Sequence, residues 1–484
     1  MAEEVKIKIS DYRDFERKLI KNGAVFLDEI KVKDTYFHQP AGRVLKITED
    51  DKGDFLVELK EKNGKFNILK YNRLKNSDNT KKRLERKYGV KCILRKKRRF
   101  WEYKGLFLNI NIFPDIGSYI IAEGKNIQKN KVASILGIKN PQYITISFDN
   151  IKILYNIFGD NLVQDEIIQL DGIYNKGRIT GYSFWVMIRN NKDQVVEGKL
   201  HLPLDSRNKF LVFEPGFPGD ASSRLERLWL KKLIDSNFTV FAVRHSGTYI
   251  NSKFSPVYIS CAEKQKRAKS KGQLFIGLKK HYTLSDWIFE PYIIVTSLKG
   301  KYKVYLAGHS FGALACLYAL CLMNRERSAL LKKIVRYISL AGGIGKVRSE
   351  NDPILIQWKK YLNMHYKKVR DKINIGNPDK NVRILKSVYN EVHKEVKNLS
   401  RDIDFVLLSP WGDTPDSLDE LCPVTESLDL IMSAKRGKLI IDKDQKGNIK
   451  QGKLAHDLDN LTSDKFLDLI EGKVSKYEGL RFSN

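Results

Sequence analysis

Cysteine is scarce in this chain, and its placement argues against two classes of protein. The 484 residues contain only five cysteines, an odd number, with neither the spacing of a zinc site nor that of a small disulfide scaffold. Scattered thiols of this kind are typical of a reducing compartment. We therefore expect a cytoplasmic protein without structural disulfides. The cysteines are Cys92, Cys261, Cys316, Cys321 and Cys422.

Long apolar runs are also lacking. No apolar stretch reaches the roughly 18 residues that a membrane-spanning helix needs. The N-terminal segment, MAEEVKIKI, has no apolar core of the kind found in a signal peptide. We therefore expect no transmembrane segment. Because one hydrophobic core rarely supports 484 residues, we expect two or more domains.

Acidic residues are in the minority. The chain has 57 Asp and Glu against 87 Lys and Arg, which gives a formal charge of +30. Such a balance favours a polyanionic partner, namely nucleic acid, polyphosphate or an anionic membrane surface. Solvated lysine faces explain it equally well, since the lysines are spread along the whole chain. We find no groove-reading or RNA-binding motif, so nucleic acid is not an expected partner.

One stretch carries a strong chemical signal. Lys303 to Leu320, KVYLAGHSFGALACLYAL, reads as a buried strand, then G-x-S-x-G, then a helix. A G-x-S-x-G can arise by chance, but between a strand and a helix it is typical of a nucleophile elbow. The glycines relieve the crowding of a sharp turn. The pattern predicts Ser310 as a nucleophile and the Phe311 N–H as an oxyanion donor.

The first 130 residues predict a different domain. Short alternating strands follow one another, interrupted by a helix over residues 11–22 and a basic helix over residues 76–88. Antiparallel strands with one charged face can close into a barrel with a polar interior. The expected inward side chains are cations, which favour an anionic ligand: Lys6, Lys8, Lys46, Lys60, Lys96 and Arg98.

The order of these strands resembles the CYTH domain, the triphosphate-tunnel fold of class IV adenylate cyclases and thiamine triphosphatases. The resemblance covers residues 1–156 and implies a polyphosphate or nucleotide ligand. A segment similar to the family's terminal helix and its ending spans residues 133–154. The other matching segments are EVKIK at 4–8, KDTYF at 33–37, GRVLKI at 42–47, KKR at 96–98 and GSYIIAE at 117–123.

This sequence departs from the family at the metal site. The family holds divalent cations with several carboxylates, whereas here only Glu4 and Glu123 remain, because Lys6 and Ile121 occupy the other positions. We therefore expect no metal, with Glu4 and Glu123 as weak candidates. The cations remain, so we expect an anion pocket without metal-assisted chemistry.

The rest of the chain resembles the α/β-hydrolase family. A hairpin is expected over residues 179–202, and alternating strands and helices follow from 210 to 342, which predicts a mostly parallel, doubly wound sheet. Gly216-Phe217-Pro218-Gly219 matches the family's oxyanion loop, although Pro215 replaces its histidine. The resemblance makes Phe217 N–H the second oxyanion donor. The expected domain spans residues 157–484, with a helical cap insertion at about 346–402.

The same resemblance suggests the other members of a catalytic triad. After a strand at 404–409, both Asp413 and Asp416 fit the place of the acid, and this alternative stays open. His365 and His393 fall in the cap, so His456 is the best-placed base, and the chain order Ser, Asp, His is the one this fold requires.

We therefore expect an α+β antiparallel barrel joined to an α/β domain. The expected activity is a serine hydrolase acting on an acyl ester, thioester or amide, without a cofactor. The alternative is a polyanion-binding sensor or scaffold protein whose hydrolase domain is inactive.

Overall fold

The computed structural model describes residues 3–62, 65–124, 128–205, 208–217, 221–245, 284–369, 377–399, 402–410, 422, 424–443, 456, 458 and 460–483. The chain forms two compact units, Met1–Ile179 and Thr180–Asn484. Residues 157–179 thus belong by their contacts to the first unit, although the expected boundary lay at residue 156. No helix in the described ranges is both long enough and apolar enough to cross a membrane.

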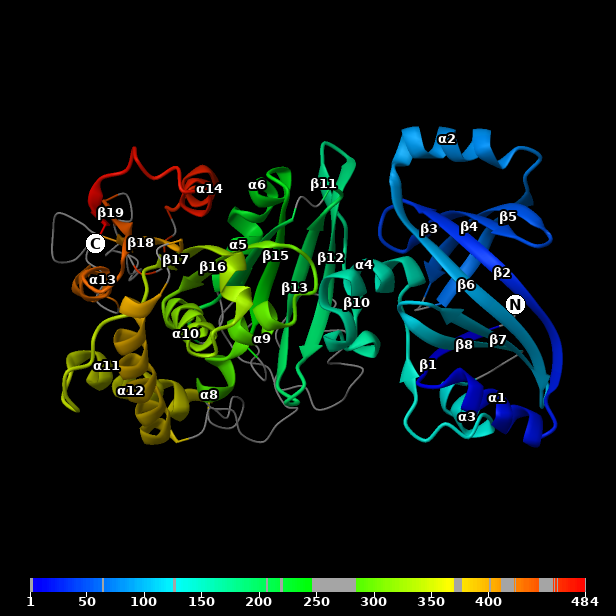
Figure 1. The fold of residues 1–484 in the computed structure, drawn as a ribbon, viewed down its shortest axis with the longest axis horizontal. Helices are drawn as coiled ribbons and strands as arrows, with labels where there is room; N and C mark the ends of the chain where they lie inside the picture. The colour runs from blue at the N-terminus through cyan, green and yellow to red at the C-terminus, as the bar shows by residue number, and fades with distance from the viewer. Residues whose placement is uncertain are drawn as a thin grey trace. The chain divides into compact units, whose positions relative to one another are not determined.

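The first unit is built on a nine-stranded antiparallel sheet (Figure 1), in the order β5-β4-β3-β2-β6-β7-β8-β1-β9. β1 to β4 and β6 to β8 bury apolar side chains, as the alternation in the sequence predicts, whereas Ile68, Leu69 and Tyr71 of β5 are exposed. The strands are β1 Glu3–Ile9, β2 Val25–Phe37, β3 Arg43–Asp50, β4 Gly53–Lys62, β5 Lys65–Arg73, β6 Val90–Tyr103, β7 Leu106–Phe113, β8 Gly117–Gly124 and β9 Gln142–Tyr143.

Helices cover the apolar face of this sheet. α1 (Tyr12–Lys21) and α3 (Lys129–Ile135) pack on a core that includes Ile7 and Leu108, and α2 (Ser77–Tyr88) places Leu84 against another part of the same sheet. α4 (Phe148–Phe158) follows. Since side chains alternate along a strand, the even-numbered residues of β1 point to the opposite face, which is polar.

The expected antiparallel barrel is present only in part among the described residues. The nine strands form an open, curled sheet: β1 and β5 approach each other, but β1 pairs with β8 and β9, and β5 pairs with β4. Closure requires strand tilt and stagger to match around the whole ring, and strand patterns alone do not specify these quantities.

The second unit contains a mostly parallel sheet, as expected from the strand–helix alternation. From β12 onward its order is β12-β13-β15-β14-β16-β17-β18-β19-β20. The antiparallel hairpin β12–β13 begins it, β14 to β19 run parallel, and β20 is antiparallel at the edge. The strands are β12 Arg178–Arg189, β13 Val195–Pro203, β14 Lys209–Glu214, β15 Phe238–Arg244, β16 Lys303–His309, β17 Ile334–Leu340, β18 Asp404–Pro410, β19 Arg436–Asp442 and β20 Gly479–Ser483.

Helices cover both faces of this sheet. α5 (Ala221–Leu228), α6 (Leu230–Asp235) and α14 (Ser463–Glu471) pack on one face, against Phe213 and its neighbours. α9 (Glu290–Thr296) and α10 (Phe311–Arg325) contact β14, where the alternate residue Val212 is fully buried. The remaining helices are α8 Leu284–Trp287, α11 Pro353–Val369, α12 Pro378–Glu395 and α13 Val424–Ile431.

Two pairs of short helices follow each other closely in the chain. α5 and α6 divide at Trp229, whose indole donates to the Leu461 carbonyl at 2.7 Å. α8 ends before α9 begins at Glu290, and Pro291 lies at the start of α9, where a missing N–H costs nothing. The short elements in the described ranges are β10 Ile168–Gln169, β11 Ile173–Asn175, and the 3₁₀ helices Gly159–Asn161, Gln164–Glu166, Ala329–Lys333 and Val396–Asn398.

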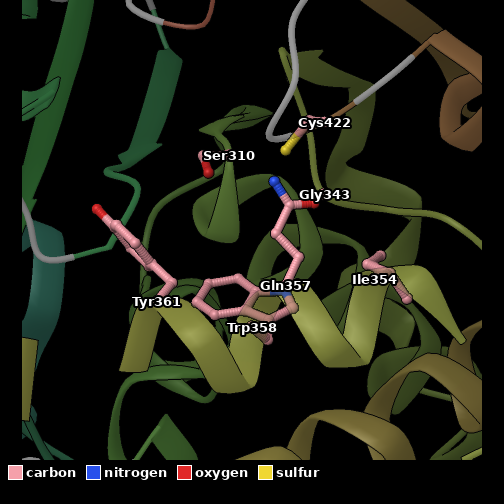
Figure 2. Close-up of a pocket in the computed structure, with 7 residues that line it drawn as sticks. All are labelled: Ser310, Gly343, Ile354, Gln357, Trp358, Tyr361 and Cys422. Carbon is pink, nitrogen blue, oxygen red and sulfur yellow. The ribbon is translucent and has the colours of Figure 1, made fainter. Parts of the chain in front are cut away.

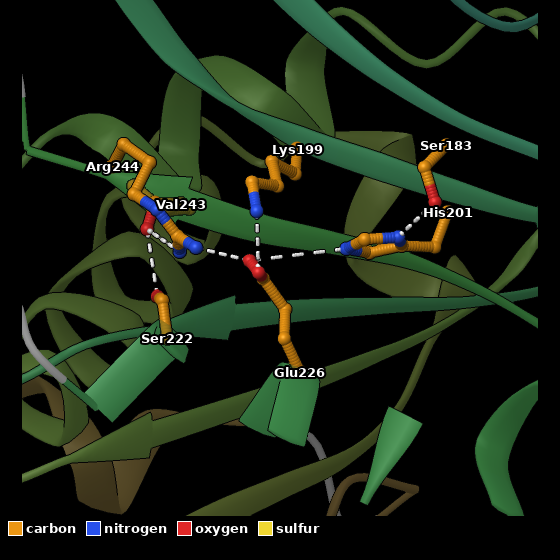
Figure 3. Close-up of polar contacts among 7 residues, drawn as sticks. All are labelled: Ser183, Lys199, His201, Ser222, Glu226, Val243 and Arg244. Carbon is orange, nitrogen blue, oxygen red and sulfur yellow. Dashed lines mark hydrogen bonds and ion pairs between the residues drawn. The ribbon is translucent and has the colours of Figure 1, made fainter. Parts of the chain in front are cut away.

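A buried polar network fastens α5 to the sheet (Figure 3). Glu226 accepts from Lys199 at 2.6 Å and also from Arg244, while His201 Nε2 lies 3.9 Å from its carboxylate. Burial acts to raise the pKa of Glu226, but Arg244, His201 and Lys199 hold it below its usual range. Ser183 Oγ lies 2.8 Å from His201 Nδ1. Both residues are buried, so this serine–histidine pair belongs to the packing of the sheet.

Candidate active site and anion pocket

Ser310 occupies a sharp turn between a strand and a helix. It follows β16 directly and precedes α10, with φ 53° and ψ −119°. This backbone conformation is strained for a residue with a side chain, and such strain concentrates at functional sites. Leu340 O accepts from the Ser310 N–H at 3.0 Å, and Gly343 N–H donates to Ser310 O at 3.2 Å. The neighbouring strand and its following loop therefore hold the strained turn in place.

Steric constraints require glycine at both positions that flank the turn, Gly308 and Gly312. A Cβ at Gly308 would lie 2.2 Å from the carbonyl carbon of Gly312. A Cβ at Gly312 would lie 2.2 Å from the carbonyl oxygen of Glu214. Both contacts are with backbone, which cannot move aside as a flexible side chain can. The glycine spacing of the motif thus follows from the close approach of strand, turn and helix.

The expected oxyanion donors lie on two segments that meet at Ser310. Phe311 is the first residue of α10, where backbone N–H groups have no acceptor within the helix. Phe217 follows β14, and the neighbouring Gly216 would place a Cβ 2.9 Å from the Cβ of Ser310. The loop after β14 therefore passes directly beside the serine.

A pocket lies between α11 and Ser310 (Figure 2). Between β17 and β18 the chain forms α11 and α12, and α11 faces the serine (Figure 2). The cavity has a volume of about 30 Å³. Its walls are largely apolar, and its lining consists of Ser310, Gly343, Ile354, Gln357, Trp358, Tyr361 and Cys422.

Hydrogen bonds and aromatic contacts anchor α11 over the serine. The Trp358 indole donates to the Tyr389 hydroxyl at 3.1 Å, and that hydroxyl donates to the Gly343 carbonyl at 3.0 Å. Tyr361 donates to the Phe217 carbonyl at 3.4 Å, and the two rings lie 5.5 Å apart. The cap thereby contacts the loop after β14 and the loop after β17, the two loops that border Ser310.

His456 lies beside the residue that precedes the nucleophile. It is buried, its ring centroid is 4.8 Å from that of His309, and its carbonyl lies 2.8 Å from His309 Nε2. Burial lowers the pKa of His309 well below its usual value, and the proximity of His456 adds to this effect. Asp413 and Asp416 both lie outside the described residues, so the alternative between them stays open.

Sequence analysis missed a buried cluster behind the elbow. Glu214 ends β14, His245 follows β15, and Glu290 begins α9; all three side chains are fully buried. His245 Nδ1 lies 2.6 Å from Glu290 and 3.5 Å from Glu214, and its ring stacks on Trp287 at 4.6 Å. Burial and the nearby Glu290 raise the pKa of Glu214 well above its usual value.

The cluster has donor types that a metal ion uses. However, the 2.6 Å separation of His245 and Glu290 is that of a direct hydrogen bond, so the cluster is held together without an ion. The only signal in the sequence was a glutamate standing directly after a fully apolar strand. Its partners lie far away in the chain, and the strand order brings them together.

The polar face of the first unit contains a second pocket. It has a volume of about 200 Å³ and is open to solvent. Four of the six expected anion-binding residues line it, namely Lys6, Lys46, Lys96 and Arg98. Lys8 and Lys60 are not part of this lining, and Lys60 is exposed.

The carboxylates Glu4 and Glu123 also line this pocket, as cross-strand neighbours on β1 and β8. Burial and the nearby Glu4 raise the pKa of Glu123. A third carboxylate, Asp34, is fully buried and lies 2.9 Å from both Lys46 and Lys96. Sequence analysis did not identify Asp34, which lies in the segment KDTYF.

Comparisons with known proteins give no family assignment from sequence. No protein-family model matches the chain, and no curated protein matches it. Solved structures similar to it include a conserved hypothetical protein from Pyrococcus furiosus, 20% identical, covering 31% of this chain and 99% of that chain with a TM-score of 0.29. They also include the α/β hydrolase GrgF from Penicillium sp., which is 16% identical. The match covers 60% of this chain and 98% of that chain, with a TM-score of 0.36.

A third similar structure is a monoacylglycerol lipase from Paleococcus ferrophilus. It is 14% identical and covers 55% of this chain and 94% of that chain, with a TM-score of 0.35. At these TM-scores the similarities carry no argument, so the fold rests on the strand orders given above. Known structures similar to this chain thus include α/β hydrolases.

Proposed function

We propose that the second unit is a serine hydrolase that cleaves an acyl ester, thioester or amide. The observation that carries the proposal is Ser310 itself: a serine in strained backbone conformation, between two sterically required glycines, opening onto a mostly apolar pocket. A buried structural serine has no need of such a conformation. The similarity to lipase and hydrolase structures is in keeping with this function but does not support it independently.

In the proposed reaction His456 removes the proton from Ser310 Oγ, which attacks the acyl carbonyl. The N–H groups of Phe217 and Phe311 hold the resulting oxyanion. His456 returns the proton to the leaving group as the acyl–oxygen, acyl–sulfur or acyl–nitrogen bond breaks. Water, deprotonated by the same histidine, then hydrolyses the acyl-enzyme. Asp413 or Asp416 orients the imidazole and stabilises its charged form.

Labelling with a fluorophosphonate probe tests this function. We expect wild-type protein to be labelled and to release 4-nitrophenol from acyl esters, whereas Ser310→Ala and His456→Ala lose both properties. Ser183→Ala is the matched control, because Ser183 also contacts a histidine yet lies within the buried network. Full labelling of Ser310→Ala would contradict the proposal. Separate Asp413→Asn and Asp416→Asn variants identify the acid.

We propose a second function for the pocket in the first unit: it binds a polyphosphate or nucleotide without metal catalysis. The four cationic side chains that line it support the binding. Among the described residues lining it, the carboxylates are only Glu4 and Glu123, fewer than metal-assisted phosphate chemistry uses. We expect binding of ATP or tripolyphosphate in the presence of EDTA. Magnesium-dependent hydrolysis of either compound would contradict this function.

The two functions are independent in their tests. The alternative function is a polyanion-binding sensor or scaffold protein with an inactive hydrolase domain. It predicts that the probe labels no serine under any condition, while the anion still binds to the first unit. Labelling that changes on addition of tripolyphosphate would indicate that the first unit regulates the second.

A further inference from the structure

Three of the four cations in the first-unit pocket already have acceptors within the protein. Lys46 and Lys96 each lie 2.9 Å from Asp34, which also accepts from Thr48 at 2.6 Å. Lys6 donates to the Ile146 carbonyl at 2.9 Å. These side chains are fixed by the protein, so they contribute less to a ligand than their number suggests.

Arg98 is different. It lines the same pocket, but its Nε is buried and has no hydrogen-bond partner. A buried donor without a partner carries a free-energy cost, which a ligand acceptor would relieve. Guanidinium groups also bind phosphate in a two-pronged geometry that lysine cannot provide. Arg98 is therefore the group in this pocket best suited to hold an anionic head.

The opposite wall of the pocket is apolar. β4 and β5 contribute Val57, Leu59, Phe66, Ile68 and Tyr71. Ile68 is 66% exposed and Tyr71 is 54% exposed, although both line the pocket. A wall of this kind gains nothing from an inorganic polyanion but buries apolar surface against an organic body.

The charge of the pocket is also small. Lys6, Lys46, Lys96 and Arg98 face the three carboxylates of Glu4, Glu123 and Asp34, which leaves one positive charge uncompensated. A tripolyphosphate carries several negative charges and would meet the carboxylates of Glu4 and Glu123 on entering. A ligand with a single phosphate group matches the available charge far better.

We infer that this pocket takes a small organic phosphate monoester, with its phosphate on Arg98 and its planar or apolar body against the wall formed by β4 and β5. The inference rests on the proposed anion binding and narrows it. Of the ligands expected from the sequence, it favours a nucleotide-like monoester over inorganic polyphosphate.

Calorimetric titration of the full chain in EDTA tests the inference with three probes: phenyl phosphate, inorganic phosphate and tripolyphosphate. We expect phenyl phosphate to bind about tenfold or more tightly than either inorganic probe. Arg98→Leu should abolish this binding, while Arg95→Leu, an exposed arginine on the same strand, should leave it unchanged. Ile68→Ser and Tyr71→Ser should weaken phenyl phosphate binding several-fold and leave inorganic phosphate unaffected.

The outcomes separate this inference from the function on which it rests. Tripolyphosphate binding as tightly as phenyl phosphate would overturn the inference and leave anion binding standing. Binding of none of the three probes would overturn both. If thermal unfolding shows that Arg98→Leu does not fold, the Ile68→Ser and Tyr71→Ser variants still test the inference. Equal affinity of wild type and these variants for phenyl phosphate would overturn it.

Discussion

Gly216 lies directly against the nucleophile: a Cβ on this glycine would be 2.9 Å from the Cβ of Ser310 and 3.0 Å from Nδ1 of His309. The loop after β14 can therefore reach the serine only with glycine at this position. Because the loop and the turn at Ser310 are in such close contact, the turn determines the course of the loop and therefore the position of the Phe217 N–H.

Gly216→Ala should therefore impair catalysis more than folding. The added methyl group pushes the loop or the serine aside by a few tenths of an ångström, which misaligns an oxyanion donor. Loss of one such donor typically costs about 10²-fold or more in kcat. We expect a fall in kcat of this order with a thermal midpoint close to wild type. Gly172→Ala, which meets only the Tyr174 side chain, is the control. Unchanged turnover would argue against this loop as part of the oxyanion site.

The buried cluster of Glu214, His245 and Glu290 predicts an unusual pH dependence. Since the folded-state pKa of Glu214 lies above its unfolded value near 4.5, the folded protein binds more protons than the unfolded chain. Stability linked to this group is thus fully present below pH 4.5 and decreases as the pH rises toward the folded-state pKa.

Glu214→Gln should remove this dependence, because an amide resembles a protonated carboxyl group. Denaturant unfolding from pH 5 to pH 8 should show the variant gaining stability relative to wild type as the pH rises. If the difference in unfolding free energy between variant and wild type stays constant with pH, or if wild type gains stability relative to the variant, Glu214 is not protonated in the folded protein.

The pH dependence of the stability linked to Glu226 should have the opposite sign. Its folded-state pKa lies below the unfolded value of 4.5, so its contribution is present above pH 4.5 and is lost as the pH falls. Glu226→Gln leaves Arg244 and Lys199 buried without a counter-charge, and breaking a buried pair in this way costs about 3 kcal/mol. We expect this loss in denaturant unfolding at pH 7 and a smaller loss at pH 4. Glu350→Gln, which removes an exposed partner of Lys386, should leave stability unchanged at both pH values.

Local pattern predicted the elements of this protein well. The alternation in the first strand placed Lys6 and Lys8 on one face, and the residues between and beside them, Val5, Ile7 and Ile9, are buried on the other face of β1. The G-x-S-x-G motif predicted the strand, turn and helix around Ser310, which the structure also has. In each case the residues that determine the backbone conformation are close to one another in the sequence, so the local sequence pattern is enough to predict it.

Contacts across the sheet could not be predicted in this way. Asp34 meets Lys46 and Lys96 because β2 pairs with both β3 and β6 in a particular register. The cluster at Glu214 forms because β14 and β15 pair in parallel, so that Glu214 at the end of β14 and His245 after β15 lie close together. The open edge of the first sheet likewise depends on stagger, not on the pattern of any one strand.

Trp358 should set the size of the acyl group that the proposed hydrolase accepts. Its side chain lines the pocket with Ser310, and its ring lies 6.1 Å from that of Phe311 and 6.2 Å from that of Phe217. Removing the indole opens apolar space in front of the nucleophile. Each methylene that gains apolar contact in a pocket is worth about 1 kcal/mol or more.

Trp358→Ala should therefore favour longer acyl chains. We expect the ratio of kcat/KM for 4-nitrophenyl octanoate over 4-nitrophenyl acetate to rise by about tenfold. Ile356→Ala is the matched control, since Ile356 lies on the same helix and is 55% exposed, and its ratio should equal that of wild type. The indole also donates to Tyr389, so thermal unfolding of each variant must accompany the kinetics. If Trp358→Ala folds normally and keeps the wild-type ratio, α11 does not form the acyl-binding wall, and chain-length preference must arise elsewhere in the second unit.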